Sequence, residues 1–136
     1  MIEEVSIEIG GQTIDKHYGL WLNIWNELTQ TSEKSSGYND MIGNISSMTT
    51  ATNADSAGTA ADPAEIPAYT MYIPLQFWFC RNPGLALPLI ALQYHEVKFN
   101  ITFKALADLH VLTDGVLSKT PTLEASLFVD YIYLDT

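Results

Sequence analysis

Two hydrophobic periods organise the N-terminal part of the chain. Across residues 5–9, apolar and polar side chains alternate, which is typical of a half-buried strand. The pair Gly10-Gly11 then predicts a turn, because glycine adopts positive φ without a Cβ clash. Beyond it, apolar residues recur at spacings of three and four and predict one amphipathic helix of about three turns. The apolar face of that helix consists of Trp21, Ile24, Trp25 and Leu28.

Later segments alternate as strands do. Residues 69–80 give the strongest signal, although Pro74 lacks a backbone N–H and so predicts an edge position or a bulge. Residues 97–104 alternate cleanly between apolar and polar side chains. Residues 123–134 carry apolar side chains on both faces, which predicts that a second sheet or a neighbouring subunit covers them. Within this last strand, we expect Asp130 to be a buried, hydrogen-bonded structural carboxylate.

The segments between these elements are predicted to be turns and loops. Residues 46–66 consist largely of Ala, Ser, Thr, Asp and Asn, so they bury little and predict a long surface loop. Residues 81–84 predict a turn, and the apolar residues 85–92, interrupted by Pro88, predict a buried helical turn or an irregular corner. Four strands, one short amphipathic helix and one long loop predict a mainly β chain. Its expected architecture is a mostly antiparallel β-sandwich or jelly roll.

Length and composition indicate a single globular domain over residues 1–136, with 47% hydrophobic and 16% charged residues. Six Lys and Arg against 16 Asp and Glu leave a net charge of −10. This balance disfavours binding to nucleic acid or to an anionic membrane surface, because both need clustered cations. No apolar run reaches the roughly 18 residues of a membrane-spanning helix, so no membrane insertion is expected. Cys80 is the single cysteine and cannot form an intrachain disulfide.

Candidate catalytic and metal-binding residues are sparse. His17, His95 and His110 are too dispersed to predict a metal site, since a zinc site needs about four histidine or cysteine ligands. Cys80 and His95 are the one nucleophile pair available, but no motif would orient it, and a buried small hydrophobe is the favoured role of Cys80. We therefore predict no enzyme, no catalytic residue, no metal ligand and no cofactor. The sequon at Asn44 is a candidate glycosylation site, although so short a pattern arises by chance.

Several stretches of the chain, taken in order, carry a family resemblance. They are IGGQTID at 9–15, WLNIWNEL at 21–28, IPLQFWFCRNPG at 73–84, LALPLIALQYHEV at 85–97 and DYIYLD at 130–135. Together they cover nearly the whole chain apart from residues 46–66. In sequence and in order, these stretches resemble the major capsid proteins of large nucleo-cytoplasmic DNA viruses, the iridovirus, phycodnavirus and mimivirus group.

The resemblance implies a structural viral protein with a double jelly-roll fold. Three subunits would form a pseudo-hexagonal capsomer, and capsomers would tile an icosahedral shell, usually over an internal lipid membrane. The implied partners are other copies in a homotrimer and capsomer lattice and minor capsid proteins, without nucleic acid. The implied location is the virion, after assembly in the host cytoplasm. The chain resembles the central part of the first, N-terminal jelly roll, so the resemblance implies a partial antiparallel jelly-roll β-sandwich. We expect a fragment or a truncated copy in which residues 46–66 are a variable surface loop.

If the chain is such a capsid protein, its large aromatic side chains are expected to build the core of the sandwich. These core candidates are Trp21, Trp25, Phe77, Phe79 and Phe103. The corner at residues 83–94 is expected to contact a neighbouring subunit or the second jelly roll, through Leu85, Leu87, Leu89 and Tyr94. The alternative function is a carbohydrate-binding jelly-roll module on a virion surface, in which exposed aromatic side chains stack on sugar rings. The candidates for that stacking are Tyr69, Tyr72 and Trp78.

Overall fold

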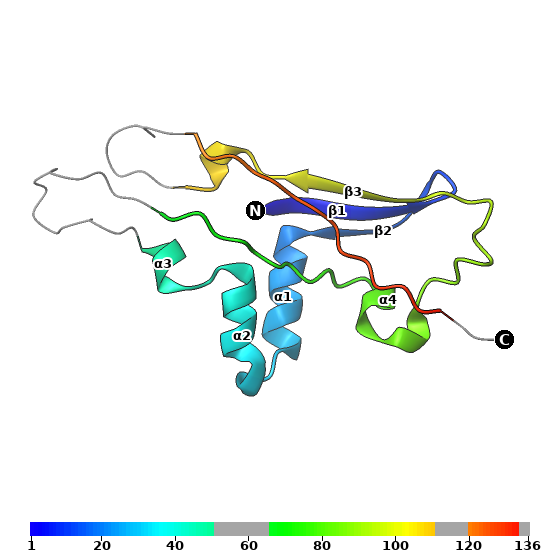
Figure 1. Cartoon of the computed structure of the whole chain (residues 1–136), viewed down its shortest axis with the longest axis horizontal. Helices are drawn as coiled ribbons and strands as arrows, with labels where there is room; N and C mark the ends of the chain where they lie inside the picture. Colours follow the sequence, from blue (N-terminus) through cyan, green and yellow to red (C-terminus); the bar gives the residue numbers. More distant parts are fainter. Residues whose placement is uncertain (51–65, 111–119, 134–136) are drawn as a thin grey trace, which may run out of the picture. The chain divides into compact units, whose positions relative to one another are not determined.

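The computed structural model describes residues 1–50, 66–110 and 120–133. The chain divides into two compact units, which are a sheet unit (residues 1–23 and 76–136) and a helical unit (residues 24–75). Figure 1 shows the helices and strands of both units, coloured along the chain. In the described part of the chain, no helix is long and apolar enough to cross a membrane.

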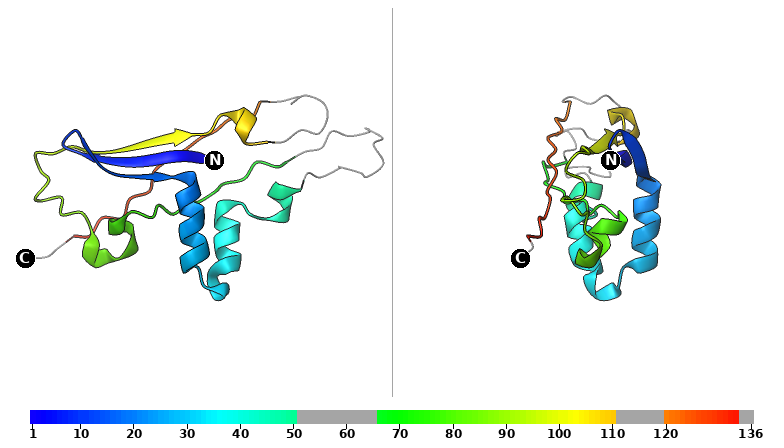
Figure 2. Two further views of the ribbon diagram at one scale, coloured as in Figure 1. Left: turned by 180° about the vertical axis from the view of Figure 1, so that it is seen from behind. Right: turned by 90° about the vertical axis from the view of Figure 1, so that its right-hand side faces the viewer.

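A three-stranded antiparallel sheet organises the sheet unit, in the order β2-β1-β3 (Figures 1 and 2). The strands are β1 (Ile2–Ile9), β2 (Gln12–Tyr18) and β3 (Val97–Phe103). β1 and β3 confirm strands predicted from alternation, whereas β2 was not predicted. The hairpin between β1 and β2 turns at Gly10 and Gly11, whose φ angles are 60° and 82°. Two positive φ angles give a tight turn whose twist matches that of the flanking strands.

The sheet has one apolar and one polar face, because side chains alternate along each strand. On the apolar face, Val5 and Ile7 of β1 are completely buried. On the polar face, Lys16 Nζ lies 3.0 Å from Glu4 Oε2 in an ion pair between neighbouring strands. The hydrogen bond to Glu4 raises the pKa of Lys16. This pair is exposed, so it contributes little to stability, and the sheet depends on its apolar face.

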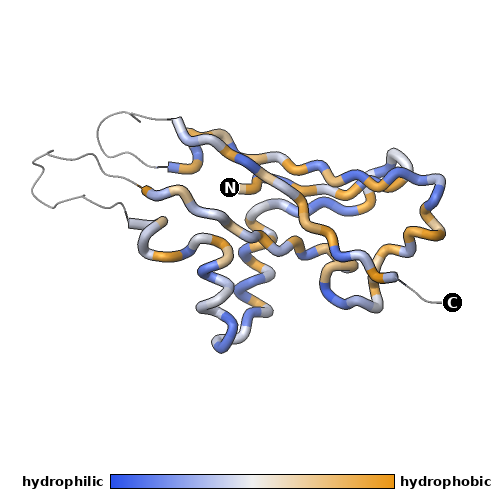
Figure 3. The backbone as a smooth tube through the Cα atoms, in the orientation of Figure 1, coloured by the Kyte–Doolittle hydropathy of each residue, from blue (hydrophilic) through white to orange (hydrophobic). Residues whose placement is uncertain are grey.

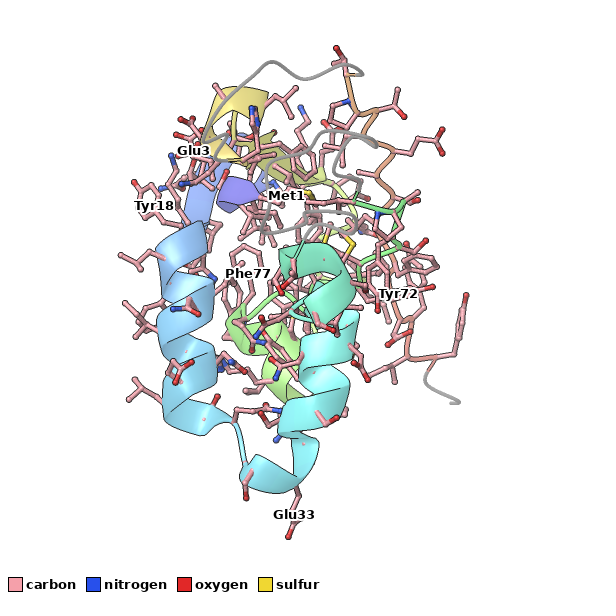
Figure 4. All side chains as sticks on the ribbon, turned by 90° about the vertical axis from the view of Figure 1, so that its left-hand side faces the viewer. Met1, Glu3, Tyr18, Glu33, Tyr72 and Phe77 are labelled. Carbon is pink, nitrogen blue, oxygen red and sulfur yellow. The ribbon has the colours of Figure 1, made fainter. Side chains whose placement is uncertain are left out.

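Phe77 closes the apolar face of the sheet. Its side chain is completely buried, and its ring stacks on His17 and Phe79, with centroids 4.6 Å and 5.4 Å away. Phe99 of β3 joins the same cluster, 6.3 Å from the Phe77 ring and 6.2 Å from the Phe79 ring. Figure 4 shows Phe77 in the interior of the sheet unit and Tyr18 on its outside. An aromatic cluster therefore forms the core of this unit.

The strand predicted for residues 69–80 is wrong. Residues 66–77 belong to no helix or strand, and the short helix α4 (Trp78–Arg81) follows directly. Pro74 has no N–H to donate, and no neighbouring strand pairs with this segment in the described part of the chain. Alternation indicates extended backbone, but a β-strand also requires a partner for its N–H and C=O groups.

Helix α1 (Gly19–Thr29) confirms the predicted amphipathic helix. Two short 3₁₀ helices, η1 (Pro83–Leu85) and η2 (Leu106–Asp108), lie before and after β3 in the sequence. The turn predicted at residues 81–84 includes the end of α4 and the start of η1. The mainly β, antiparallel character expected from the sequence is confirmed by the sheet that these elements flank.

A second helix, α2 (Ser32–Ile42), lies in the helical unit and was not predicted. Its residues are polar on most faces, so it lacks the apolar spacing that reveals an amphipathic helix. It ends at Gly43, whose φ of 78° provides the left-handed cap common at helix ends. The short helix α3 (Ser46–Thr49) begins the predicted loop 46–66, of which residues 51–65 lie outside the described part.

The last carbonyls of α2 receive hydrogen bonds from the segment that follows the loop. The Tyr69 hydroxyl donates to Asp40 O at 2.7 Å, and the Tyr72 N–H donates to Met41 O at 2.8 Å. Carbonyls at a helix C-terminus have no partner inside the helix, so donors from another segment satisfy them. These bonds join the end of α2 to residues 69 and 72 within the helical unit.

The strand predicted for residues 123–134 is also wrong. Residues 120–133 are exposed throughout and belong to no helix or strand, while position 134 lies outside the described residues. Asp130 is exposed with them, contrary to the buried carboxylate expected. Figure 3 shows hydrophobic and hydrophilic positions mixed along this segment. The sequence has strand character, but nothing pairs with its backbone as a strand in the described structure.

We expect Phe77→Ala to destabilise the chain by about 3–5 kcal/mol, because it removes the ring that closes the apolar face and leaves a cavity. Urea unfolding followed by tryptophan fluorescence measures this loss. Tyr133→Ala is the matched control, since it removes an aromatic ring that is 90% exposed, and its effect should stay within about 0.5 kcal/mol. Equal losses in the two variants would show that Phe77 does not close the core.

Candidate functional site

The three histidines occupy separate structural positions in the sheet unit. His17 is buried in the aromatic cluster, with its Nε2 3.3 Å from Asp15 Oδ2. His95 is exposed beside the β1–β2 turn, where a Cβ on Gly10 would lie 2.7 Å from its Nδ1. His110 Nδ1 lies 2.7 Å from a backbone carbonyl of η2. Across residues 1–50, 66–110 and 120–133, no group of three His, Cys, Asp or Glu side chains could hold a metal ion.

Cys80 lies in α4 and is exposed, rather than buried as expected. Desolvation of its sulfur still raises the pKa of the thiol, against the opposing effects of a Phe77 backbone hydrogen bond and the positive charge of Arg81. A raised pKa keeps the thiol protonated near neutral pH, and the protonated form is a poor nucleophile. No hydrogen bond joins Cys80 to His95 among the described residues, so the geometry does not activate this thiol.

The predicted contact corner, residues 83–94, is an irregular segment held by its own backbone. The Gly84 N–H donates to Asn82 Oδ1 at 2.9 Å, which caps the start of η1. The Ala91 N–H donates to the Pro88 carbonyl at 2.9 Å and closes a turn. These short-range bonds pair several of the backbone N–H groups of the corner and define its turns.

The corner presents large apolar side chains to solvent. Ile90 is 84% exposed and Tyr94 is 88% exposed, and Leu85 and Leu89 are also exposed. Leu87 is half-buried. Several large apolar side chains exposed on one short segment are typical of an interaction surface. Ile90 was not predicted as a contact residue, although its place in the apolar run at residues 85–92 could have indicated it.

The predicted core residues differ in their burial. Phe77 is completely buried, whereas the other four are half-buried. Those four are Trp21, Trp25, Phe79 and Phe103. Their individual contributions to stability stay predictions. His17 was not predicted as a core residue, because a lone histidine in a polar stretch carries no signal for the ring stacking that buries it.

The aromatic residues considered for sugar binding do not lie on one strand. Trp78 belongs to α4, and its ring meets the edge of Phe79 with centroids 4.9 Å apart. Tyr69 uses its hydroxyl to bond Asp40, and only Tyr72 of the three is more than half exposed. A sugar-stacking face needs neighbouring rings on one surface, and the strand that was expected to provide it is not formed.

Asn44 is exposed directly after α2. Its side-chain amide nitrogen, which glycosylation would modify, donates to Asn39 Oδ1 at 3.1 Å. The bond belongs to the cap that ends α2, so the amide already has a structural partner. Glycosylation at Asn44 stays a prediction.

The chain is similar to known proteins over almost its whole length. A family model described as "Major capsid protein N-terminus" matches residues 1–135. The chain belongs to this capsid protein family. The family resemblance predicted from the sequence motifs is therefore confirmed.

Several relatives are capsid proteins of large DNA viruses. The major capsid protein of Pyramimonas orientalis virus is 54% identical over 136 residues, which is 100% of this chain and 31% of that protein. Capsid protein 1 of Acanthamoeba polyphaga mimivirus is 40% identical over 139 residues, covering 100% of this chain and 23% of the relative. The major capsid protein of Frog virus 3 is 33% identical over 122 residues, covering 87% and 26%. These relatives are named as structural proteins of capsids, not as enzymes.

Solved structures agree with the sequence relatives. The crystal structure of PBCV-1 VP54, fitted into a reconstruction of the virophage Sputnik, matches with a TM-score of 0.52 and 38% identity. That match covers 74% of this chain and 21% of the VP54 chain. The fold class expected from the sequence is thus confirmed for this chain. The chain spans about a third or less of the relatives it matches, from 23% to 31% of the three described above.

We expect the Cys80 thiol to react slowly with iodoacetamide at pH 7.5, because its raised pKa leaves less thiolate than an ordinary cysteine has. The rate should increase as the pH rises through the elevated pKa. Mass spectrometry of the alkylated chain follows the reaction. The same chain unfolded in guanidinium chloride is the control and should react faster, whereas a faster reaction in the folded chain would reveal an activated thiol.

Proposed function

We propose that this chain is the N-terminal part of a capsid subunit that associates with copies of itself into trimeric capsomers of an icosahedral shell. Membership of the capsid protein family supports a role in the shell. The observation that carries the proposed contact is the exposed apolar corner at residues 83–94. The chain would act by shape and association rather than by chemistry, and no cofactor is involved.

The corner suits association because its apolar side chains sit on a backbone with internal hydrogen bonds. Leu85, Leu89, Ile90 and Tyr94 are exposed and would leave water on contact, while the N–H groups of Leu85 and Leu89 are already paired within the corner. Burial of apolar area contributes roughly 25 cal/mol per Å², so a few such side chains repeated at each interface add up. The partner surface is a neighbouring subunit or the second jelly roll of the same polypeptide.

The charge of the chain sets a condition on this assembly. A net charge of −10 makes subunits repel one another. At physiological ionic strength, dissolved salt screens the repulsion between charges that lie more than roughly 8–10 Å apart. The same charge disfavours contact with packaged nucleic acid, which supports a position in the shell.

The remaining assignments belong to this proposal. The chain forms a single partial jelly-roll domain over residues 1–136, and residues 46–66 form a variable surface loop. Minor capsid proteins are the further partners, and assembly takes place in the host cytoplasm. The hydrogen bonds that Tyr69 and Tyr72 donate to α2 support the loop assignment, because they join the residues after the loop to the helix before it.

We expect Leu89→Asp to block trimer formation, because it places a charge inside a contact that must lose water. Sedimentation equilibrium should give a trimer mass for the unaltered chain and a monomer mass for the variant. Far-UV circular dichroism checks that the variant is folded.

Gln93→Asp is the matched control, since it adds the same charge at an exposed position of the same corner without removing an apolar side chain. It should leave most of the trimer intact. An unaltered trimer yield from Leu89→Asp would contradict the proposed contact, and an unaltered chain that stays monomeric would contradict self-association of this chain.

A further inference from the structure

The corner at residues 83–94 ends beside the turn between β1 and β2 (Figures 1 and 2). One residue beyond the ladder that joins β1 and β3, the Gly10 N–H donates to the Glu96 carbonyl at 3.0 Å. On the side of the corner, the His95 N–H donates to the Leu92 carbonyl at 2.8 Å. His95 therefore lies between a hydrogen bond that extends the sheet and one that belongs to the corner.

The ring of His95 lies against the turn. A Cβ atom added to Gly10 would come 2.7 Å from Nδ1 and 3.4 Å from Cγ of His95. Cβ atoms in proteins essentially never approach another atom within 3.0 Å. A side chain at position 10 and the ring of His95 therefore cannot both keep these places. The ring can touch the turn because glycine has no Cβ atom.

Gly11 separates the two reasons for having glycine in this turn. The φ angles of Gly10 and Gly11 are 60° and 82°, so an alanine is strained at either position. A Cβ atom on Gly11, however, would meet no atom within 4 Å. Only position 10 needs glycine for the close approach of another side chain as well.

His95 also determines where the end of the corner is presented. Tyr94, which is 88% exposed, directly precedes it in the chain. Consecutive Cα atoms are only about 3.8 Å apart, so a displaced His95 displaces Tyr94 with it. Large aromatic side chains are enriched among the residues that contribute most to binding at protein interfaces. The contact with the turn therefore acts on a residue that is suited to association.

We propose that His95 is a positioning residue, whose ring packs on Gly10 and holds the end of the corner in the orientation that meets a partner. The inference rests on the proposed association through the corner and adds how the sheet sets its orientation. A surface that is already ordered before contact loses less conformational freedom on binding. Loss of the ring should therefore weaken association more than it weakens the sheet.

Hydrogen exchange of the dilute, monomeric chain, followed by NMR, tests the contact itself. We expect the amide of residue 95 to exchange at least about ten times faster in Gly10→Ala than in Gly11→Ala, which has the same strain without the clash. The β1 amides that pair with β3 should differ by no more than about threefold between these two variants. His95→Ala, which strains no backbone, should also accelerate exchange of the amide at residue 95 about tenfold over the unaltered chain.

The double variant, Gly10→Ala with His95→Ala, shows whether the two residues act through one contact. Residues in contact have non-additive effects, so exchange should stay near the tenfold increase of the single variants. Independent effects would instead multiply to about a hundredfold increase and would overturn the inference. Equal exchange rates in Gly10→Ala and Gly11→Ala would overturn it too, because the clash with the ring would then have no effect.

Sedimentation equilibrium tests the positioning role. We expect His95→Ala to raise the dissociation constant of the trimer at least about tenfold, while the urea midpoint of unfolding stays close to that of the unaltered chain. Gln93→Ala is the matched control, since it truncates an exposed side chain of the same corner, and it should change the constant by less than about threefold.

The remaining outcomes separate this inference from the proposed function. An unchanged dissociation constant for His95→Ala, or an equal loss in Gln93→Ala, would overturn the positioning role and leave the proposed function standing. Weaker association without faster exchange would make His95 a contact residue and would also overturn it. If the unaltered chain stays monomeric, the proposed self-association fails, and the exchange rates alone decide whether His95 holds the corner.

Discussion

The sheet unit depends on the burial of one aromatic ring against an apolar sheet face. Three strands with one apolar face cannot stay folded in water unless something covers that face. In this chain the cover is Phe77, whose ring is completely buried between His17, Phe79 and Phe99. The covering segment lies far from β1 and β2 in sequence and directly precedes the corner. Closing the core therefore also fixes where the corner begins.

The elements that could be predicted from the sequence are those whose pattern lies within the element itself. β1, β3 and α1 were predictable because their hydrophobic periods arise within the element itself. β2 has few apolar residues, but the Gly10-Gly11 pair after an alternating segment is a known hairpin signal that could have indicated it. α2 was not predictable from periodicity, because it buries no apolar stripe and is held by a cap and by donors from Tyr69 and Tyr72.

The two strands that do not form in the structure fail for a shared physical reason. Residues 69–80 and 123–134 alternate as strands do, but alternation reports only which side chains would share a face. It carries no information on whether a partner strand is present. The corner could be predicted from its run of apolar residues. Sequence does not distinguish exposed leucines from buried ones, so only the structure shows that Leu89 is exposed and Leu87 is half-buried. The family resemblance, by contrast, was carried by long motifs and did not depend on correct strand assignments.

The proposed contact at the corner and the net charge of the chain act in opposite directions on association. Apolar area would supply binding strength with little dependence on the register between two copies. A net charge of −10 opposes the close approach of copies, and dissolved salt screens charges that lie more than about 8–10 Å apart. Association through the corner would therefore strengthen as the ionic strength rises, because salt weakens the repulsion between copies and leaves the burial of apolar area in place.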